Sequence, residues 1–141
     1  QGMARSRRQL VALTSTTCLG FLVAGVVAFA HPEPGPNITL INPIPPNEDS
    51  VAAGQALYQR NCVPCHGVSG RGDGPVGLTL NPPPANLTIH TVPGVHPDGQ
   101  LDLWISDGFP GASAMPAFRT IIADDDRWNL VNYLRTLGTT Q

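Results

Sequence analysis

The stretch CVPCHGVSGRGDGP, residues 62–75, decides how the rest of the chain is interpreted. It opens with CVPCH, in which two residues separate the cysteines and a histidine follows directly. Thiols at this spacing can add to the two vinyl groups of one haem, and the adjacent imidazole then lies against the iron. A thioredoxin-like pair expects a βαβ context, and a zinc site needs a second pair of ligands that the chain lacks. The motif therefore predicts one haem, bound covalently through Cys62 and Cys65, with His66 as an iron ligand.

Three stretches around this motif have helical periodicity, and loops rich in Gly and Pro separate them; they cover residues 51–61, 98–107 and 124–137. Asp49 or Ser50 is suited to cap the first helix, which delivers the first cysteine at its end. Gly108 is expected to stop the second helix and Gly138 the third. No alternating strand pattern of any length occurs. The sequence therefore predicts an all-α domain.

The N-terminal part of the chain has the pattern of a membrane anchor. Residues 1–9 contain three arginines, and residues 10–30 (LVALTSTTCLGFLVAGVVAFA) form an uncharged run long enough to cross a hydrocarbon core of about 30 Å. The preceding arginines predict that residues 1–9 stay in the cytoplasm and that everything after residue 30 lies on the outer side. A cleaved signal peptide with Ala28-Phe29-Ala30 as its processing site is the competing interpretation. We expect an uncleaved signal-anchor helix.

A proline-rich linker follows, with six prolines among residues 31–50 (HPEPGPNITLINPIPPNEDS). This density of proline excludes helices and central strands and favours an extended chain. At ~3.1 Å per residue, such a stretch could span up to about 60 Å. It would serve as a tether that either swings or lies against a partner, and it leaves residues 51–141 to form the cofactor domain.

Composition limits the partners of this domain. The chain of 141 residues has a net charge of −2, but five of its eight arginines and all ten of its acidic residues follow residue 30. The outer part is therefore clearly acidic, and a nucleic acid is excluded as an expected partner. A small domain of this size also buries a limited fraction of its surface, so a large apolar cofactor at its centre would help to stabilise it.

The run CVPCHGVSGRGDGP resembles the haem-binding stretch and glycine loop of class I cytochromes c, and the resemblance extends over nearly all of residues 51–137. It implies the class I cytochrome c fold around one haem c. In that family a proline just after the loop offers its carbonyl to the axial histidine, and Pro75 matches this proline. The resemblance also implies that the first and last helices cross, with Gly54 permitting close approach and Tyr58 packing near Tyr133 and Leu134.

The second axial ligand has three candidates downstream of the motif, which are Met115, His90 and His96. Met115 lies on a Gly/Pro loop, GASAMPAF, that is similar to the distal loop of class I cytochromes c, in which a methionine precedes proline. The resemblance therefore implies that His66 and Met115 coordinate the iron. Six apolar residues are expected to line the pocket, namely Trp104, Leu78, Leu80, Leu87, Ile105 and Phe118.

Met/His ligation raises the reduction potential relative to bis-histidine ligation and leaves no open coordination site, which favours an electron carrier over an enzyme. A haem peroxidase or gas sensor with a displaceable Met115 is the alternative. We expect a subunit or tethered shuttle of a quinol-oxidising, respiratory or photosynthetic complex, for which alternative complex III is one candidate host. Its partners would be redox donor and acceptor proteins and other subunits, contacted through the anchor and the linker. The haem domain would lie on the periplasmic side of a bacterial cytoplasmic membrane.

Overall fold

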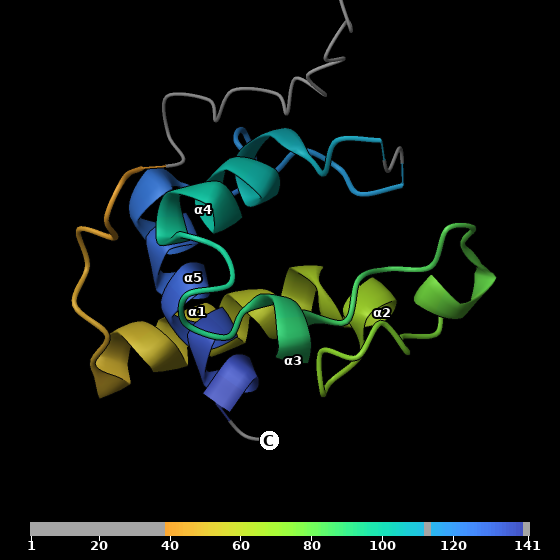
Figure 1. Ribbon diagram of the computed structural model, residues 1–141, viewed down its shortest axis with the longest axis horizontal. Coiled ribbons are helices and arrows are strands. Elements are labelled where there is room, and N and C mark those ends of the chain that lie inside the picture. Colours follow the sequence, from red (N-terminus) through yellow and green to blue (C-terminus); the bar gives the residue numbers. More distant parts are fainter. Residues whose placement is uncertain (1–38, 112–113, 140–141) are drawn as a thin grey trace, which may run out of the picture. The chain divides into compact units, whose positions relative to one another are not determined.

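The computed structural model describes residues 39–111 and 114–139 (Figure 1). The predicted membrane helix at residues 10–30 and the first part of the predicted linker lie outside these ranges, so both remain predictions. Within the described ranges, no helix is long and apolar enough to cross a membrane.

The described part of the chain is helical and contains no strand, which confirms the prediction of an all-α fold. Two long helices and one of intermediate length carry the domain, and short helical turns connect them (Figure 1). In chain order the elements are α1 (Glu48–Asn61), α2 (Val63–His66), the 3-10 turn η1 (Gly77–Thr79), α3 (Leu87–His90), α4 (Asp98–Asp107) and α5 (Asp124–Thr139).

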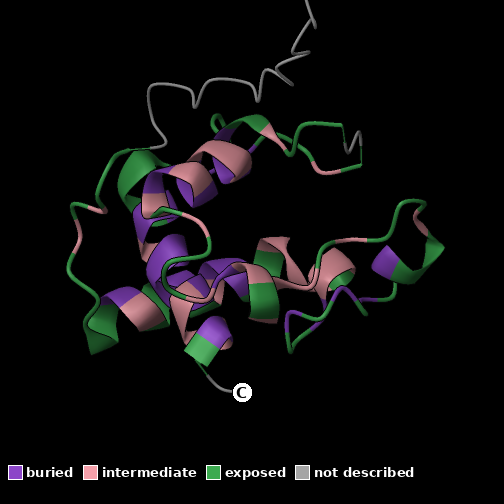
Figure 2. Cartoon of the chain, viewed as in Figure 1, coloured by how far each residue is buried: buried purple, intermediate pink, exposed green. Residues whose placement is uncertain are grey.

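Helices α1 and α5 cross at Gly54, as the resemblance implied. A Cβ atom at Gly54 would overlap the carbonyl oxygen of Asn129 and would lie 2.8 Å from Cβ of Tyr133. Tyr58, one turn further along α1, packs against Tyr133 with the ring centroids 5.2 Å apart. Buried residues concentrate at this crossing (Figure 2). The crossing is therefore the centre of the core, and it fixes the end of α1 from which the haem motif continues.

Helix α1 begins three residues earlier than its periodicity indicates. The side chain of Asn47 caps the helix by accepting a hydrogen bond from the Ser50 amide at 2.9 Å. Glu48 and Asp49 then occupy the first turn, where the helix dipole favours negative charge. The prediction that Asp49 or Ser50 caps the helix was wrong, because Ser50 is buried and its hydroxyl accepts a hydrogen bond from Asn132 of α5 at 2.7 Å.

The described end of the predicted linker is bound to the domain rather than free. Asn42 donates to the carbonyl of Trp128 at 3.0 Å and to the side chain of Asn132 at 2.8 Å. Asn132 in turn donates to the carbonyl of Ile44 at 3.0 Å, and the carbonyl of Leu40 accepts from the first turn of α4. We call residues 40–46 the strap. The linker boundary at residue 50 is therefore corrected, since residues 40–46 pack on the domain and residues 48–50 belong to α1.

Helices α4 and α5 end differently. Gly108 follows α4 with a φ of 83° and stops it, as predicted. Gly138, predicted to close α5, instead lies inside its last turn. A Cβ atom there would lie 2.6 Å from the amide nitrogen of Val92, so this glycine permits close contact with the segment after α3.

Candidate haem site

The two cysteines of the motif lie on a single short helical turn. Cys62 ends α1, where its amide donates to the Tyr58 carbonyl at 2.8 Å, and its own carbonyl begins α2 by accepting from the His66 amide at 2.8 Å. Cys62 and Cys65 are three residues apart on this turn, a spacing that places side chains on one side of a helix. Both thiols are free and half-buried. Burial raises the pKa of the Cys62 thiol to about 12, so it stays protonated at neutral pH.

His66, the last residue of α2, is held through one of its ring nitrogens. Nδ1 lies 3.2 Å from the carbonyl oxygen of Ala85. A carbonyl can only accept, so this contact selects the tautomer in which Nδ1 carries the proton and Nε2 keeps a free lone pair. Burial lowers the pKa of His66, and the hydrogen bond to Ala85 opposes this shift. The ring is therefore presented in the neutral form that a metal ion requires.

The glycine loop after α2 is folded back onto the motif. The amide of Gly72 donates to the carbonyl of His66 at 2.9 Å, and the amide of Gly74 donates to that of Cys65 at 3.2 Å. Gly67 follows His66 directly with a φ of 75°, a conformation that favours glycine. The buried hydroxyl of Tyr58 donates to the Gly67 carbonyl at 2.7 Å. The crossing helix α1 therefore fixes the backbone on both sides of His66.

The segment that carries Met115 is attached to the end of α4. The carbonyl of Met115 would lie 2.9 Å from a Cβ atom at Gly108, so the two backbones touch. Further along, the amides of Phe118 and Arg119 each donate at 3.0 Å to carbonyls in the last turns of α4. Met115 itself is half-buried, and residues 112–113 lie outside the described ranges. These contacts fix the segment, while the role of Met115 as an iron ligand stays a prediction.

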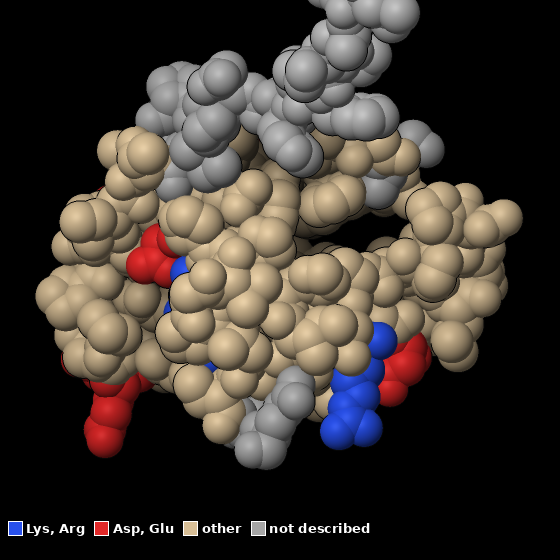
Figure 3. Space-filling view, viewed as in Figure 1, with Lys and Arg blue, Asp and Glu red and all other residues tan. Residues whose placement is uncertain are grey.

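An opening separates this segment from the motif side of the molecule. In Figure 3 it lies between the residues that follow α4 and the segment that leads to α3. The six residues predicted to line a pocket divide into two groups. Ile105 and Phe118 are buried in the core, and the others remain half-buried (Trp104, Leu80 and Leu87) or exposed, as for Leu78 with 74% of its surface accessible. Apolar surface is therefore left for a ligand to cover.

A family model described as Cytochrome c matches residues 51–138, which is more than half of the chain. The chain belongs to the cytochrome c family. This membership implies haem-based electron transfer, and it agrees with the helical fold and with the positions of the two cysteines, Cys62 at the start of α2 and Cys65 within it. A search of curated proteins found no match.

Two solved structures are similar to this cytochrome. The first is the Kuenenia stuttgartiensis reducing HAO-like protein complex Kustc0457/Kustc0458, with 31% identity, a TM-score of 0.60 and coverage of 77% of this chain. This cytochrome spans 52% of that chain, or about half its length. The second is the KustC0563 c-type cytochrome, with 24% identity, a TM-score of 0.48, and coverage of 60% of this chain and 95% of the other.

The residues of the cytochrome fit the haem c that the family carries. Two free thiols lie on one helical turn, and the imidazole that follows them keeps Nε2 available. Apolar side chains beyond the motif remain exposed or half-buried. Haem c is bound covalently through thioether bonds to Cys62 and Cys65. No cluster of three or more His, Cys, Asp or Glu side chains suited to a further metal ion occurs in the described ranges.

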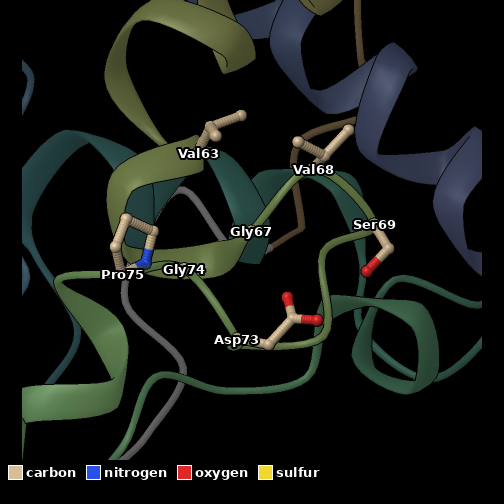
Figure 4. A pocket seen from close by; sticks show the side chains of 7 residues that line it. All are labelled: Val63, Gly67, Val68, Ser69, Asp73, Gly74 and Pro75. Atoms are coloured by element: carbon tan, nitrogen blue, oxygen red, sulfur yellow. The ribbon is translucent and has the colours of Figure 1, made fainter.

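The cytochrome departs from the expected pattern at Pro75. The carbonyl that contacts the His66 ring belongs to Ala85, so the expectation that Pro75 supplies it is corrected. Pro75 instead lines a pocket of about 400 Å³ on the glycine loop (Figure 4), together with Val63, Gly67, Val68, Ser69, Asp73 and Gly74. The missed signal was the run Pro82-Pro83-Pro84 before Ala85, because three prolines stiffen the chain that positions this carbonyl.

His90 and His96, the other ligand candidates, lie together on the surface of the domain. Their rings stack with centroids 5.7 Å apart, and Nδ1 of His96 lies 2.9 Å from the side-chain oxygen of Gln100. His96 also packs edge-on against Trp104 at 4.8 Å. Their mutual contacts give both rings a place in the fold that does not depend on coordinating the iron.

Proposed function

We propose that this cytochrome is a one-electron carrier whose haem iron is held by His66 and Met115. The observation that carries the proposal is the contact of His66 with Ala85, because it leaves Nε2 with a free lone pair and fixes the plane of the ring. The attachment of the Met115 segment to the end of α4 supports a second ligand from that side. Such a haem supplies reversible one-electron chemistry of its iron.

In this function the protein positions the side chains that would hold the iron, and it encloses the haem. The hydrogen bond from Nδ1 to the Ala85 carbonyl raises the basicity of Nε2, the other ring nitrogen of His66. This nitrogen is therefore a stronger ligand for iron. Tyr58 holds the backbone next to the histidine through the Gly67 carbonyl. The apolar shell lowers the local dielectric constant, which tunes the reduction potential. His66 and Met115 together would hold the iron and leave no coordination position open to a substrate.

We further propose that the cytochrome is a resident subunit of a membrane electron-transfer complex, with its haem domain on the periplasmic side of a bacterial cytoplasmic membrane. The uncharged run at residues 10–30 and the arginines before it support the anchor and its orientation. A solved relative with 31% identity was determined as part of a protein complex. This supports a carrier that exchanges electrons with other subunits of one assembly. Donor and acceptor would be redox proteins of that assembly, for which a quinol-oxidising complex such as alternative complex III is one host.

The strap supports a resident subunit over a long-range shuttle. Residues 40–46 are bound to the domain and cannot act as a tether. Of the predicted linker, this leaves residues 31–38 for that role. At ~3.1 Å per residue their reach is about 25 Å, compared with about 60 Å for the whole linker. The haem would therefore exchange electrons close to the anchor.

Carbon monoxide distinguishes this function from a peroxidase or gas sensor. The reduced full-length protein, purified in mild detergent, is expected not to bind carbon monoxide at neutral pH, because Met115 occupies the position that the gas needs. Met115→Ala should open that position and bind carbon monoxide readily, and it serves as the positive control. Rapid binding by the wild type would overturn the closed site and favour a sensor or peroxidase. Identification of the subunits that copurify would test the host complex separately.

A further inference from the structure

The pocket on the glycine loop combines an apolar lining with one carboxylate (Figure 4). Gly67 and Gly74 line it with buried backbone. Its polar side chains are those of Ser69 and Asp73, and both residues are exposed. Its apolar side chains are half-buried or exposed, and they belong to Val63, Val68 and Pro75. We call this pocket of about 400 Å³ the loop pocket; its exposed side chains leave it accessible from solvent.

The loop pocket lies beside the residues that hold the haem and not among them. Cys62, Cys65 and His66 are separated by spacings of one helical turn, so their side chains share one face of that turn. Val63 and Gly67 each come one position later than Cys62 and His66, which places them about 100° further round the helix. None of the two cysteines and His66 lines the loop pocket. A haem attached to the cysteines therefore leaves this pocket free.

The carboxylate of Asp73 is held in the loop pocket without a cation. Its Oδ1 would overlap a Cβ atom at Gly67, so it packs directly over the Cα atom of that glycine. Among the described residues, no hydrogen bond or ion pair joins Asp73 to another side chain, and Arg71 on the same loop is not paired with it. Figure 4 shows the Ser69 hydroxyl and the Asp73 carboxylate directed into the space that the loop encloses. Two groups that can accept hydrogen bonds are therefore available to a ligand.

An apolar lining with one carboxylate suits a ligand that has an aliphatic stem and a cationic end. Arginine fits this description better than lysine. Its planar guanidinium can donate two parallel hydrogen bonds to a carboxylate, keeps further donors for a hydroxyl such as that of Ser69, and is more weakly hydrated than an ammonium group. Arginine is also enriched among the residues that contribute most to protein interfaces. The outer part of the chain has a negative net charge, which favours association with a basic partner.

We propose that the loop pocket receives an arginine side chain of the redox partner of this cytochrome. The guanidinium would bind Asp73 and Ser69, and the stem would pack against Val63, Val68 and Pro75. Val63 lies between the two cysteines in the sequence, so an arginine bound there holds the partner within one helical turn of the haem attachment. The inference rests on the electron-carrier function proposed above and names a contact through which the partner is oriented.

Propylguanidinium, which is the arginine side chain without its backbone, tests the chemistry of the loop pocket. Amide ¹H–¹⁵N spectra of the reduced full-length holoprotein should show saturable shifts at Gly67, Ser69 and Gly74, with a dissociation constant in the millimolar range. Asp73→Asn keeps the shape of the side chain but removes its charge, and it should weaken binding about fivefold. Asp125→Asn is the matched control, because it removes the same charge from an exposed carboxylate on α5, and it should leave the affinity unchanged.

Butylammonium, the lysine side chain, should bind more weakly than propylguanidinium because it has fewer donors in a less suitable geometry. Three results would overturn the proposal. They are the absence of saturable shifts in the wild type, the wild-type affinity in Asp73→Asn, and butylammonium binding as tight as that of propylguanidinium.

A photo-crosslinking residue in place of Arg71 tests whether the arginine comes from a partner protein, since Arg71 lies on the same loop but does not line the pocket. In native membranes we expect a cross-link to an arginine-containing segment of another protein. Asp73→Asn, or an excess of propylguanidinium, should lower its yield about fivefold. A cross-link to lipid or to a second copy of the chain, or a yield that neither change affects, would overturn the proposal. Carbon monoxide binding by the reduced wild type would instead refute the proposed function without altering the effect of propylguanidinium, so the two failures can be told apart.

Discussion

Replacement of Gly54 by alanine tests the helix crossing that holds the haem motif in place. The added methyl group would overlap the Asn129 carbonyl oxygen and would lie 2.7 Å from its carbon and 2.8 Å from Cβ of Tyr133. These atoms belong to the backbone of α5 or are attached directly to it, so they cannot move aside as the end of a long side chain could. Helix α5 must therefore shift away from α1.

The size of the effect is the difference between two terms. Overpacking a core by one or more methylene groups costs about 1–3 kcal/mol, and a clash with a backbone atom belongs at or above the upper end. Alanine in place of glycine within a helix returns about 1 kcal/mol. We therefore expect Gly54→Ala to lower the free energy of unfolding by about 2 kcal/mol or more. Gly54→Leu should prevent stable holoprotein altogether.

Guanidinium unfolding of the full-length holoprotein, followed by helical circular dichroism and by haem absorbance, measures this difference. Ala53→Leu is the matched control, because Ala53 is exposed on the same helix and surface substitutions usually change stability by no more than about 0.5 kcal/mol. Gly54→Ala with wild-type stability or better would show that the helices are not in backbone contact there. Normal accumulation of Gly54→Leu would refute the crossing entirely.

Three further substitutions, one of them with a matched control, test other parts of the structure. Arg127→Met should lower the free energy of unfolding by about 3–5 kcal/mol, because it leaves the buried carboxylate of Asp102 without its cation. The control Arg119→Met breaks an exposed ion pair and should lower it by less than about 1 kcal/mol. Equal losses in the two variants would contradict the assignment of Arg127 and Asp102 as a buried ion pair. Asn132→Ala should release the strap, which is seen as faster amide hydrogen exchange in residues 40–46; unchanged exchange there would show that the strap is held by other contacts. Tyr58→Phe keeps the ring but loses the buried hydrogen bond to the Gly67 carbonyl, so chemical unfolding should show a loss of about 1–3 kcal/mol in the free energy of unfolding. A loss well outside this range would contradict the role of this hydrogen bond.

The local features of the fold could be predicted from the sequence because each depends on neighbouring residues. The CVPCH motif specifies its chemistry within five positions, and Gly108 stops α4 through its own backbone conformation. Gly54 and Tyr58 were assigned through resemblance to a family. The crossing of α1 and α5 followed from that resemblance rather than from periodicity.

The features that were missed depend on contacts between distant residues. The Ala85 carbonyl is a backbone group, and an alanine side chain gives no sign that its carbonyl faces a histidine 19 positions away. Arg127 and Asp102 are residue types that usually lie on the surface, and they come from different helices. Nothing in the sequence therefore indicates that they form a buried ion pair. Asn42 joins α5 through a contact that spans 90 positions, so no local pattern indicates that part of the proline-rich stretch packs on its own domain.

The central claim is that His66 and Met115 close the iron of a covalently bound haem. The most direct test is the near-infrared and visible spectrum of the oxidised full-length protein, compared with that of Met115→Leu. The wild type should show the charge-transfer band from methionine sulfur to iron, and the variant should lose this band and fall in reduction potential. A wild type without the band, or a Met115→Leu variant with an unchanged spectrum, would contradict the account.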